Sequence, residues 1–164
     1  MSDLLEMRKV SVTYDTYSGM VQSVRNISFC VKKGETVALV GESGCGKSVT
    51  AKSIMGLIKK PGKISKDSEI IFSGTNIQKF SKDQWRKFRG KECSMIFQDA
   101  LVSLNPTMKI GRQIIENLDN HAKELSKEEK EQKAIEMLTL TGIPDAKQCL
   151  MKYPHELSGG MRQR

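Results

Sequence analysis

One stretch of eight residues constrains the fold more than any other part of the chain. Residues 41–48 read Gly-Glu-Ser-Gly-Cys-Gly-Lys-Ser and fit the pattern GxxxxGK[ST]. The apolar run at residues 36–40 predicts a strand buried on both faces, as in a parallel sheet. Residues 49–58 predict a helix that ends at residues 59–62, where two lysines precede Pro-Gly. This order of strand, loop and helix predicts an α/β fold with a phosphate-binding loop, and we call residues 41–48 the phosphate loop.

Each residue type in the phosphate loop suits contact with a phosphate group. Glycines permit backbone angles that other residues resist, so successive N–H groups can point inward at an anion. Lys47 is expected to reach the β- and γ-phosphates, and the Ser48 hydroxyl to bind Mg²⁺. The predicted phosphate-binding residues are Gly41, Ser43, Gly44, Cys45, Gly46, Lys47, Ser48 and Val49. The alternative is a glycine-rich turn that binds no ligand.

Composition excludes several other classes of protein. The 164 residues suffice for one domain, or for one domain with a small subdomain, and 38% of them are hydrophobic, which argues against a disordered chain. No apolar stretch is long enough for a transmembrane helix, and residues 1–10 lack the apolar segment of a secretory signal. The formal net charge is +8, but only 5% of the residues are aromatic, so nucleic-acid binding is disfavoured.

The four cysteines, at positions 30, 45, 93 and 149, include no CxxC pair. This spacing argues against a zinc site and against a disulfide framework, and it favours a reducing compartment. Cys45 lies in the phosphate loop, beside a lysine and a helix N-terminus, where a thiol can be reactive. The alternative is a small residue that the loop tolerates, and we expect bound phosphate to shield it.

Other elements follow from local patterns. Alternating apolar residues predict strands at 7–14 and 24–31, and short apolar runs predict strands at 69–72 and 94–97. Ser81 is a predicted N-cap for a short helix that stops at Gly90. Ser126 has the capping-box spacing to Glu129, and the helix that follows is expected to bury its apolar residues Ala134, Ile135 and Leu138 and to end at Gly142.

A second motif lies at the other end of the chain. Residues 157–161 read Leu-Ser-Gly-Gly-Met, and Gln98 lies between the two motifs, 51 residues after Lys47 (98 − 47) and 59 residues before Leu157 (157 − 98). This order and spacing resemble those of the ATP-binding-cassette (ABC) ATPases over essentially the whole chain. Residues 94–99, 103–111 and 153–164 are most similar to the ATPases of oligopeptide, dipeptide and nickel importers. Ala100, where that group usually has proline, and Met161, where the superfamily more often has glutamine, depart from the pattern.

The resemblance implies a fold and a set of domains. The expected fold is α/β, a P-loop NTPase of the ABC type, with an N-terminal antiparallel β subdomain and an α-helical subdomain. The expected divisions are residues 1–99 for the nucleotide-binding core, 100–156 for the helical subdomain, and 157–164 for the signature motif and the start of its helix. ABC ATPases continue with a strand that ends in Asp-Glu and with a switch histidine. Their absence from residues 1–164 predicts a truncated chain that hydrolyses ATP poorly and associates through an unpaired sheet edge.

The resemblance also assigns roles to residues by position. Tyr14 corresponds to the aromatic residue that stacks on adenine, with Tyr17 as the alternative. Gln98 corresponds to the glutamine that contacts Mg²⁺ and the attacking water, so the expected metal contacts are Ser48 and Gln98. The γ-phosphate of ATP held by the opposite subunit is expected to contact Ser158, Gly159 and Gly160.

The implied function is that of the ATP-binding subunit of an ABC importer, which couples ATP and Mg²⁺ binding and ATP hydrolysis to the uptake of peptides. The expected partners are a second ATP-binding subunit, two transmembrane permease subunits and, indirectly, an extracellular substrate-binding protein. The expected location is the cytoplasmic face of the cell membrane. Two alternatives stay open: the ATPase of a nickel importer, and a soluble ABC protein that acts on nucleic acid or ribosomes.

Overall fold

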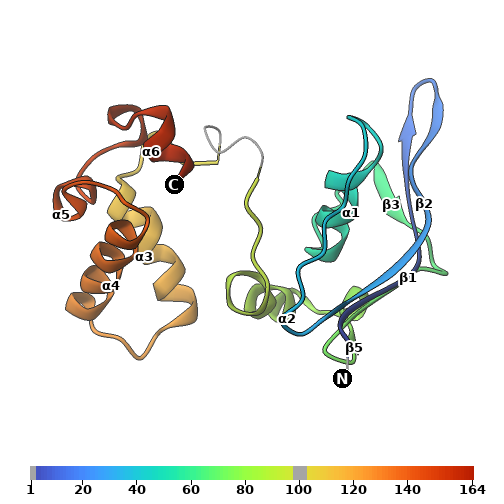
Figure 1. The fold of residues 1–164 in the computed structure, drawn as a ribbon, viewed down its shortest axis with the longest axis horizontal. Coiled ribbons are helices and arrows are strands. Elements are labelled where there is room, and N and C mark those ends of the chain that lie inside the picture. Colours follow the sequence, from blue (N-terminus) through green and yellow to red (C-terminus); the bar gives the residue numbers. More distant parts are fainter. Residues whose placement is uncertain (1–2, 98–102) are drawn as a thin grey trace. The chain divides into compact units, whose positions relative to one another are not determined.

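The computed structural model describes residues 3–97 and 103–164, which form two compact units, Met1–Arg89 and Gly90–Arg164 (Figure 1). We call these the first and the second unit and describe each by itself. Residues 98–102, which include Gln98, lie outside the described residues. The division into residues 1–99, 100–156 and 157–164 stays a prediction, since its first boundary falls in that gap.

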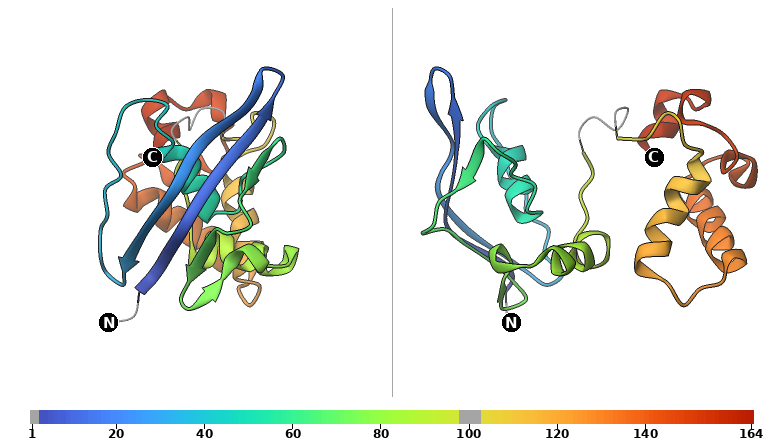
Figure 2. Two further views of the ribbon diagram at one scale, coloured as in Figure 1. Left: turned by 90° about the vertical axis from the view of Figure 1, so that its right-hand side faces the viewer. Right: turned by 180° about the vertical axis from the view of Figure 1, so that it is seen from behind.

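The described part of the first unit is built on a five-stranded antiparallel sheet. Two long strands, β1 (Asp3–Thr16) and β2 (Gly19–Lys32), form a hairpin and lie side by side in Figure 2. The short strands β3 (Gly62–Ile64) and β4 (Glu69–Phe72) pair with β1, and β5 (Thr75–Asn76) pairs with β4. The predicted strands at 7–14, 24–31 and 69–72 are thereby confirmed.

One face of β1 carries the core of the first unit. Met7, Val10 and Val12 are almost fully buried, although Met7 and Val10 are three residues apart. Lys9 has a φ of 49°, and the pairing of β1 with β2 shifts register between Met7 and Val10. This β-bulge exchanges odd for even positions on the buried face, so one apolar face continues along the whole strand.

Helix α1 (Lys47–Ile54) contacts β2 and ends earlier than predicted. Gly56 adopts a φ of 60°, its N–H donates to the Ser53 carbonyl, and the Leu57 N–H donates to the Lys52 carbonyl. These two bonds form a Schellman motif, which closes the helix at the glycine. The predicted helix end at residues 59–62 is therefore wrong, because a left-handed glycine stops the helix even though apolar residues follow.

Two predicted strands are absent from the described residues. Residues 36–40 and 94–97 have no strand pairing, and their apolar side chains are largely exposed; Val40, for example, is 88% exposed. A strand needs a neighbour for its backbone N–H and C=O groups, and no described segment pairs with either stretch. The prediction of a buried strand at 36–40 is therefore wrong, and so is the prediction of a strand at 94–97.

A helical segment follows the sheet of the first unit. It comprises η1 (Ile77–Lys79), α2 (Lys82–Lys87) and the π-helical turn η2 (Phe88–Glu92). Ser81 caps α2 as predicted and forms a capping box with Gln84, but the helical turns continue past Gly90. Phe80, Trp85 and Phe88 pack edge to face, which ties this segment into one aromatic cluster.

The second unit is helical in its described part. Its elements are α3 (Ile110–His121), α4 (Lys127–Leu140), α5 (Ala146–Cys149), η4 (Pro154–Glu156) and α6 (Gly159–Gln163). Buried Ile110, Ile143, Cys149 and Leu157 form its core. The capping box of Ser126 and Glu129 is confirmed, as are the burial of Ala134 and the helix end at Gly142. Among the described residues, no helix is long and apolar enough to cross a membrane.

Candidate nucleotide-binding site

The phosphate loop leads directly into α1, as predicted. Lys47 is the first residue of the helix, and its Nζ lies 2.7 Å from the carbonyl oxygens of both Gly41 and Glu42. The same Nζ lies 3.5 Å from Cys45 Sγ. The loop therefore curls around the ammonium group, and the positive charge of Lys47 lies inside this turn.

Gly46 holds the junction between the loop and the helix. Its φ is 96°, and its carbonyl oxygen accepts hydrogen bonds from the Thr50 N–H at 2.8 Å and from Thr50 Oγ1 at 3.0 Å. Thr50 is buried beneath the loop. The first turn of α1 is thus fixed by these contacts, while residues 41–45 and Ser48 of the phosphate loop are exposed.

One side chain at the end of the phosphate loop, that of Ser48, is suited to bind Mg²⁺. Ser48 is exposed in the first turn of α1, next to the loop, and its hydroxyl is the kind of hard oxygen ligand that Mg²⁺ accepts. Among the described residues, no group of three His, Cys, Asp or Glu side chains could hold a metal ion. Mg²⁺ commonly takes few protein ligands and completes its shell with nucleotide phosphates and water, so Ser48 fits that role.

The two candidate adenine-stacking residues lie on the β1–β2 hairpin. Tyr14 is half-buried at the end of β1, where a Cβ placed on Gly62 of β3 would lie 2.6 Å from its ring. Tyr17 lies in the hairpin turn and is fully exposed. Tyr14 is therefore partly covered by Gly62, whereas the ring of Tyr17 is free on both faces. The adenine contact of Tyr14 stays a prediction.

The signature motif forms a capped helix start in the second unit. The Oγ of Ser158 accepts a hydrogen bond from the Met161 N–H at 3.2 Å, and Gly159 and Gly160 are exposed in the first turn of α6. Leu157, just before it, is buried in the core, and Arg164 Nη1 donates to the Gly142 carbonyl oxygen at 2.8 Å. Both ends of this segment are held, so the small-residue turn is presented in a fixed shape.

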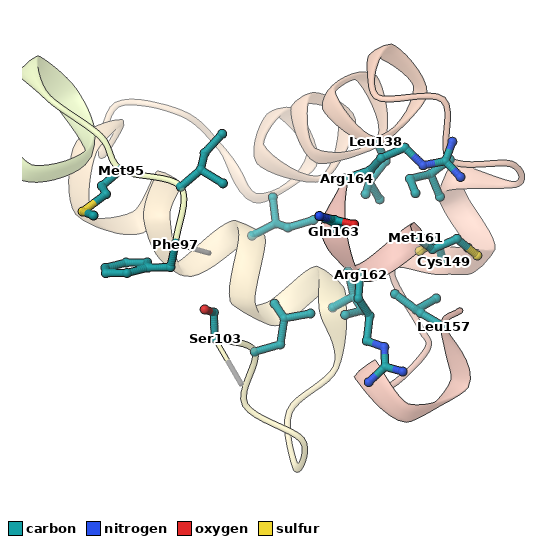
Figure 3. A pocket seen from close by; sticks show the side chains of 15 residues that line it. Met95, Phe97, Ser103, Leu138, Cys149, Leu157, Met161, Arg162, Gln163 and Arg164 are labelled. Atoms are coloured by element: carbon teal, nitrogen blue, oxygen red, sulfur yellow. The ribbon is translucent and has the colours of Figure 1, made fainter. Parts of the chain in front are cut away.

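An apolar cavity of about 370 Å³ in the second unit was not foreseen in the sequence (Figure 3). Leu138, Cys149 and Leu157 line it together with Met161, and the backbone-extended residues Met95 and Phe97 line it from another side. Its lining residues come from six separate stretches of residues 95–164, and no local sequence pattern joins them.

The chain matches a family model and many curated proteins. The model, described as ABC transporter, matches residues 24–164. The chain is 48% identical to the dipeptide transport ATP-binding protein DppD of Lactococcus lactis over 98% of its length, and 49% identical to the oligopeptide transport ATP-binding protein OppD of Bacillus subtilis. It spans about half the length of these curated relatives, 46% and 45% respectively.

Solved structures share the fold. The dimeric structure of MJ0796, a bacterial ABC transporter cassette, superposes with a TM-score of 0.82 over 96% of this chain and 65% of that one, at 23% identity. A post-hydrolysis structure of the same cassette, bound to ADP and Pi, has a TM-score of 0.79. The predicted ABC cassette fold, with its antiparallel β subdomain and its helices, is confirmed. The family model matches residues 24–164, which is most of the chain, so the chain belongs to the ABC transporter family.

Proposed function

We propose that this chain is the ATP-binding part of a subunit that drives peptide uptake through an ABC importer. The observation that carries the proposal is the phosphate loop, which encloses the Lys47 ammonium group and opens α1. A triphosphate has the charge that this loop suits, because a lysine and a helix N-terminus both favour an anion.

Each remaining contact is assigned by position. Lys47 binds the β- and γ-phosphates, and Ser48 holds Mg²⁺ together with Gln98. The metal, when bound, neutralises phosphate charge during hydrolysis. Tyr14, or Tyr17 at the hairpin tip, stacks on adenine. Ser158, Gly159 and Gly160 contact the γ-phosphate held by a second ATP-binding subunit, and the dimeric state described for MJ0796 supports this arrangement.

The names of the relatives support a peptide cargo. Curated proteins that are 42–49% identical to the chain carry the names of dipeptide, oligopeptide or peptide transport ATP-binding proteins, which supports peptides over nickel or nucleic acid. We therefore assign two permease subunits, an extracellular binding protein and a place at the cytoplasmic face of the membrane.

Nucleotide binding is tested by titrating the chain with a fluorescent ATP analogue and Mg²⁺. We expect saturable binding that Lys47→Ala weakens at least about tenfold, because a charge-assisted contact contributes roughly 1.5–3 kcal/mol. Lys33→Ala is the matched control, since Lys33 is exposed in the turn after β2. Equal affinities of the parent chain and the Lys47 variant would refute the role of the phosphate loop.

The cargo is tested in the organism. Deletion of the gene should reduce uptake of labelled di- and oligopeptides, and a gene carrying Lys47→Ala should fail to restore it. Uptake of radiolabelled nickel should not change. A loss of nickel uptake with normal peptide uptake would replace the peptide assignment with the nickel alternative.

A further inference from the structure

The helix that carries Lys47 and Ser48 is short. It has eight residues, about two turns, and helices of this length are marginal without tertiary contacts. Its apolar content is low, and the residues it buries are the small polar Thr50 and Ser53. The position of the two phosphate-binding side chains therefore depends on whatever holds α1 at its ends. Gly46 and Thr50 hold the N-terminal end.

The C-terminal end is held by one side chain from a distant part of the chain. Arg89 Nε donates to the Met55 carbonyl oxygen at 2.8 Å, and Arg89 Nη2 donates to the Gly56 carbonyl oxygen at 2.9 Å. These carbonyls belong to the C-cap residue and to the glycine that follows it in the Schellman turn, beyond the reach of further helical N–H groups. The guanidinium also places a positive charge at the negative end of the helix dipole. Arg89 thus supplies donors for these two carbonyl groups and adds a second positive charge to that of Lys52 in the last turn of α1.

Trp85 completes the contact. Arg89 Cζ lies 4.8 Å from the centre of the Trp85 ring, a cation–π geometry. A Cβ on Gly56 would lie 2.6 Å from the same ring, so the indole packs directly against the turn that Arg89 binds. Arg89 and Trp85 are both half-buried, which shields the two hydrogen bonds from water. The arginine is therefore held in one orientation on the end of α1.

We infer that Arg89 is a positioning residue for the phosphate site. It fixes α1 from its C-terminal end and so sets where Lys47 and Ser48 stand at the other end. The effect of Arg89 on nucleotide binding rests on the proposed function, whereas the contact of Arg89 with the end of α1 does not depend on it.

Two measurements on the same variants test this role. Arg89→Ala should lower the affinity for the fluorescent ATP analogue with Mg²⁺ about tenfold, since it removes two hydrogen bonds from a charged donor. Hydrogen exchange of the α1 amides should become about tenfold faster, while the amides of β1 and β4 keep their protection. Arg89→Lys, which keeps the charge but not the planar two-donor group, should lie between the parent and the alanine variant.

Arg86→Ala is the matched control. Arg86 lies one turn earlier, is 69% exposed and pairs with Asp83 on its own helix, so its removal should change neither measurement. If Arg89→Ala fails to fold, Arg89→Lys decides: normal affinity and normal α1 exchange in that variant overturn the inference. Failure of the parent chain to bind nucleotide would refute the proposed function instead, and the exchange rates of α1 would still decide the role of Arg89.

Discussion

A Cβ atom added to Gly46 would lie 2.4 Å from the carbonyl oxygen of Ser23 in β2. The junction of the phosphate loop with α1 is thus in direct contact with the backbone of the sheet. A backbone atom cannot move aside as the end of a flexible side chain can. The contact sets the distance between β2 and the start of α1. Glycine is therefore required at this position both because no space is left for a side chain and because the backbone angle is left-handed.

Gly46→Ala should destabilise the chain and disrupt the phosphate loop. The left-handed φ of 96° costs a non-glycine residue about 1–2 kcal/mol, and the clash with Ser23 adds roughly 1–3 kcal/mol. Gly34→Ala is the control, because Gly34 has a φ of 78° but open space around its Cβ position. Chemical denaturation of both variants measures the difference. Equal losses in the two would show that the contact with Ser23 has no cost.

The sequence predicted those features that depend on a few neighbouring residues. The caps at Ser81 and Ser126 and the helix end at Gly142 require only the residue type and its spacing, and the structure confirms all three. The phosphate loop is equally local. The helix end at Gly56 was missed, because Leu57 and Ile58 continue the apolar pattern beyond the glycine that stops the helix.

Features that depend on a distant partner could not be predicted. A run such as residues 36–40 is apolar enough for a buried strand, but pairing requires a neighbour that no short pattern reveals. The bulge at Lys9 is hidden because Arg8 and Lys9 are both polar. The contact of Arg89 with Gly56 joins residues 33 positions apart, so nothing near either residue indicates it.

The capping box of α4 should make stability depend on pH. The Ser126 N–H donates to Glu129 Oε2 at 2.7 Å, and this bond lowers the pKa of Glu129 below its ordinary value of 4.5. A lowered pKa in the folded state means that the contribution is complete above pH 4.5 and is lost as pH falls through the lowered value. The free energy of unfolding of the parent chain should therefore exceed that of Glu129→Gln at pH 7, with the gap closing in acid. Glu128→Gln, on the same turn, is the control. A gap that stays constant between pH 7 and 3 contradicts the prediction.

The cysteines should differ in their reaction with an alkylating reagent. Cys30 and Cys45 are exposed, whereas burial raises the pKa of the Cys93 and Cys149 thiols and reduces the thiolate that reacts. Peptide mass spectrometry at pH 8 should show fast labelling of Cys30 and Cys45, slower labelling of Cys93, and labelling of Cys149 only under denaturing conditions. An ATP analogue should protect Cys45 and leave Cys30 reactive. Rapid labelling of Cys149 in the folded chain would be inconsistent with its place in the core.

Leu157 anchors the signature motif, so its loss should affect both stability and the shape of the turn. Leu157 is 6% exposed and packs with Ile110, Ile143 and Cys149, directly before Ser158. Leu157→Ala should lower the free energy of unfolding by about 2–4 kcal/mol, from lost burial and the cavity left behind. Leu140→Ala is the matched control, since Leu140 is 72% exposed at the end of α4 and should change stability by less than about 0.5 kcal/mol.

The same pair of variants tests whether the core holds the signature turn in place. The Ser158 cap on the Met161 N–H depends on the backbone position that Leu157 fixes, so Leu157→Ala should speed hydrogen exchange at Met161 and Arg162. Leu140→Ala should leave exchange at those amides unchanged. If Leu157→Ala destabilises the chain but the Met161 amide stays as protected as in the parent, then the cap of Ser158 alone maintains the turn, and the anchoring role of Leu157 is refuted.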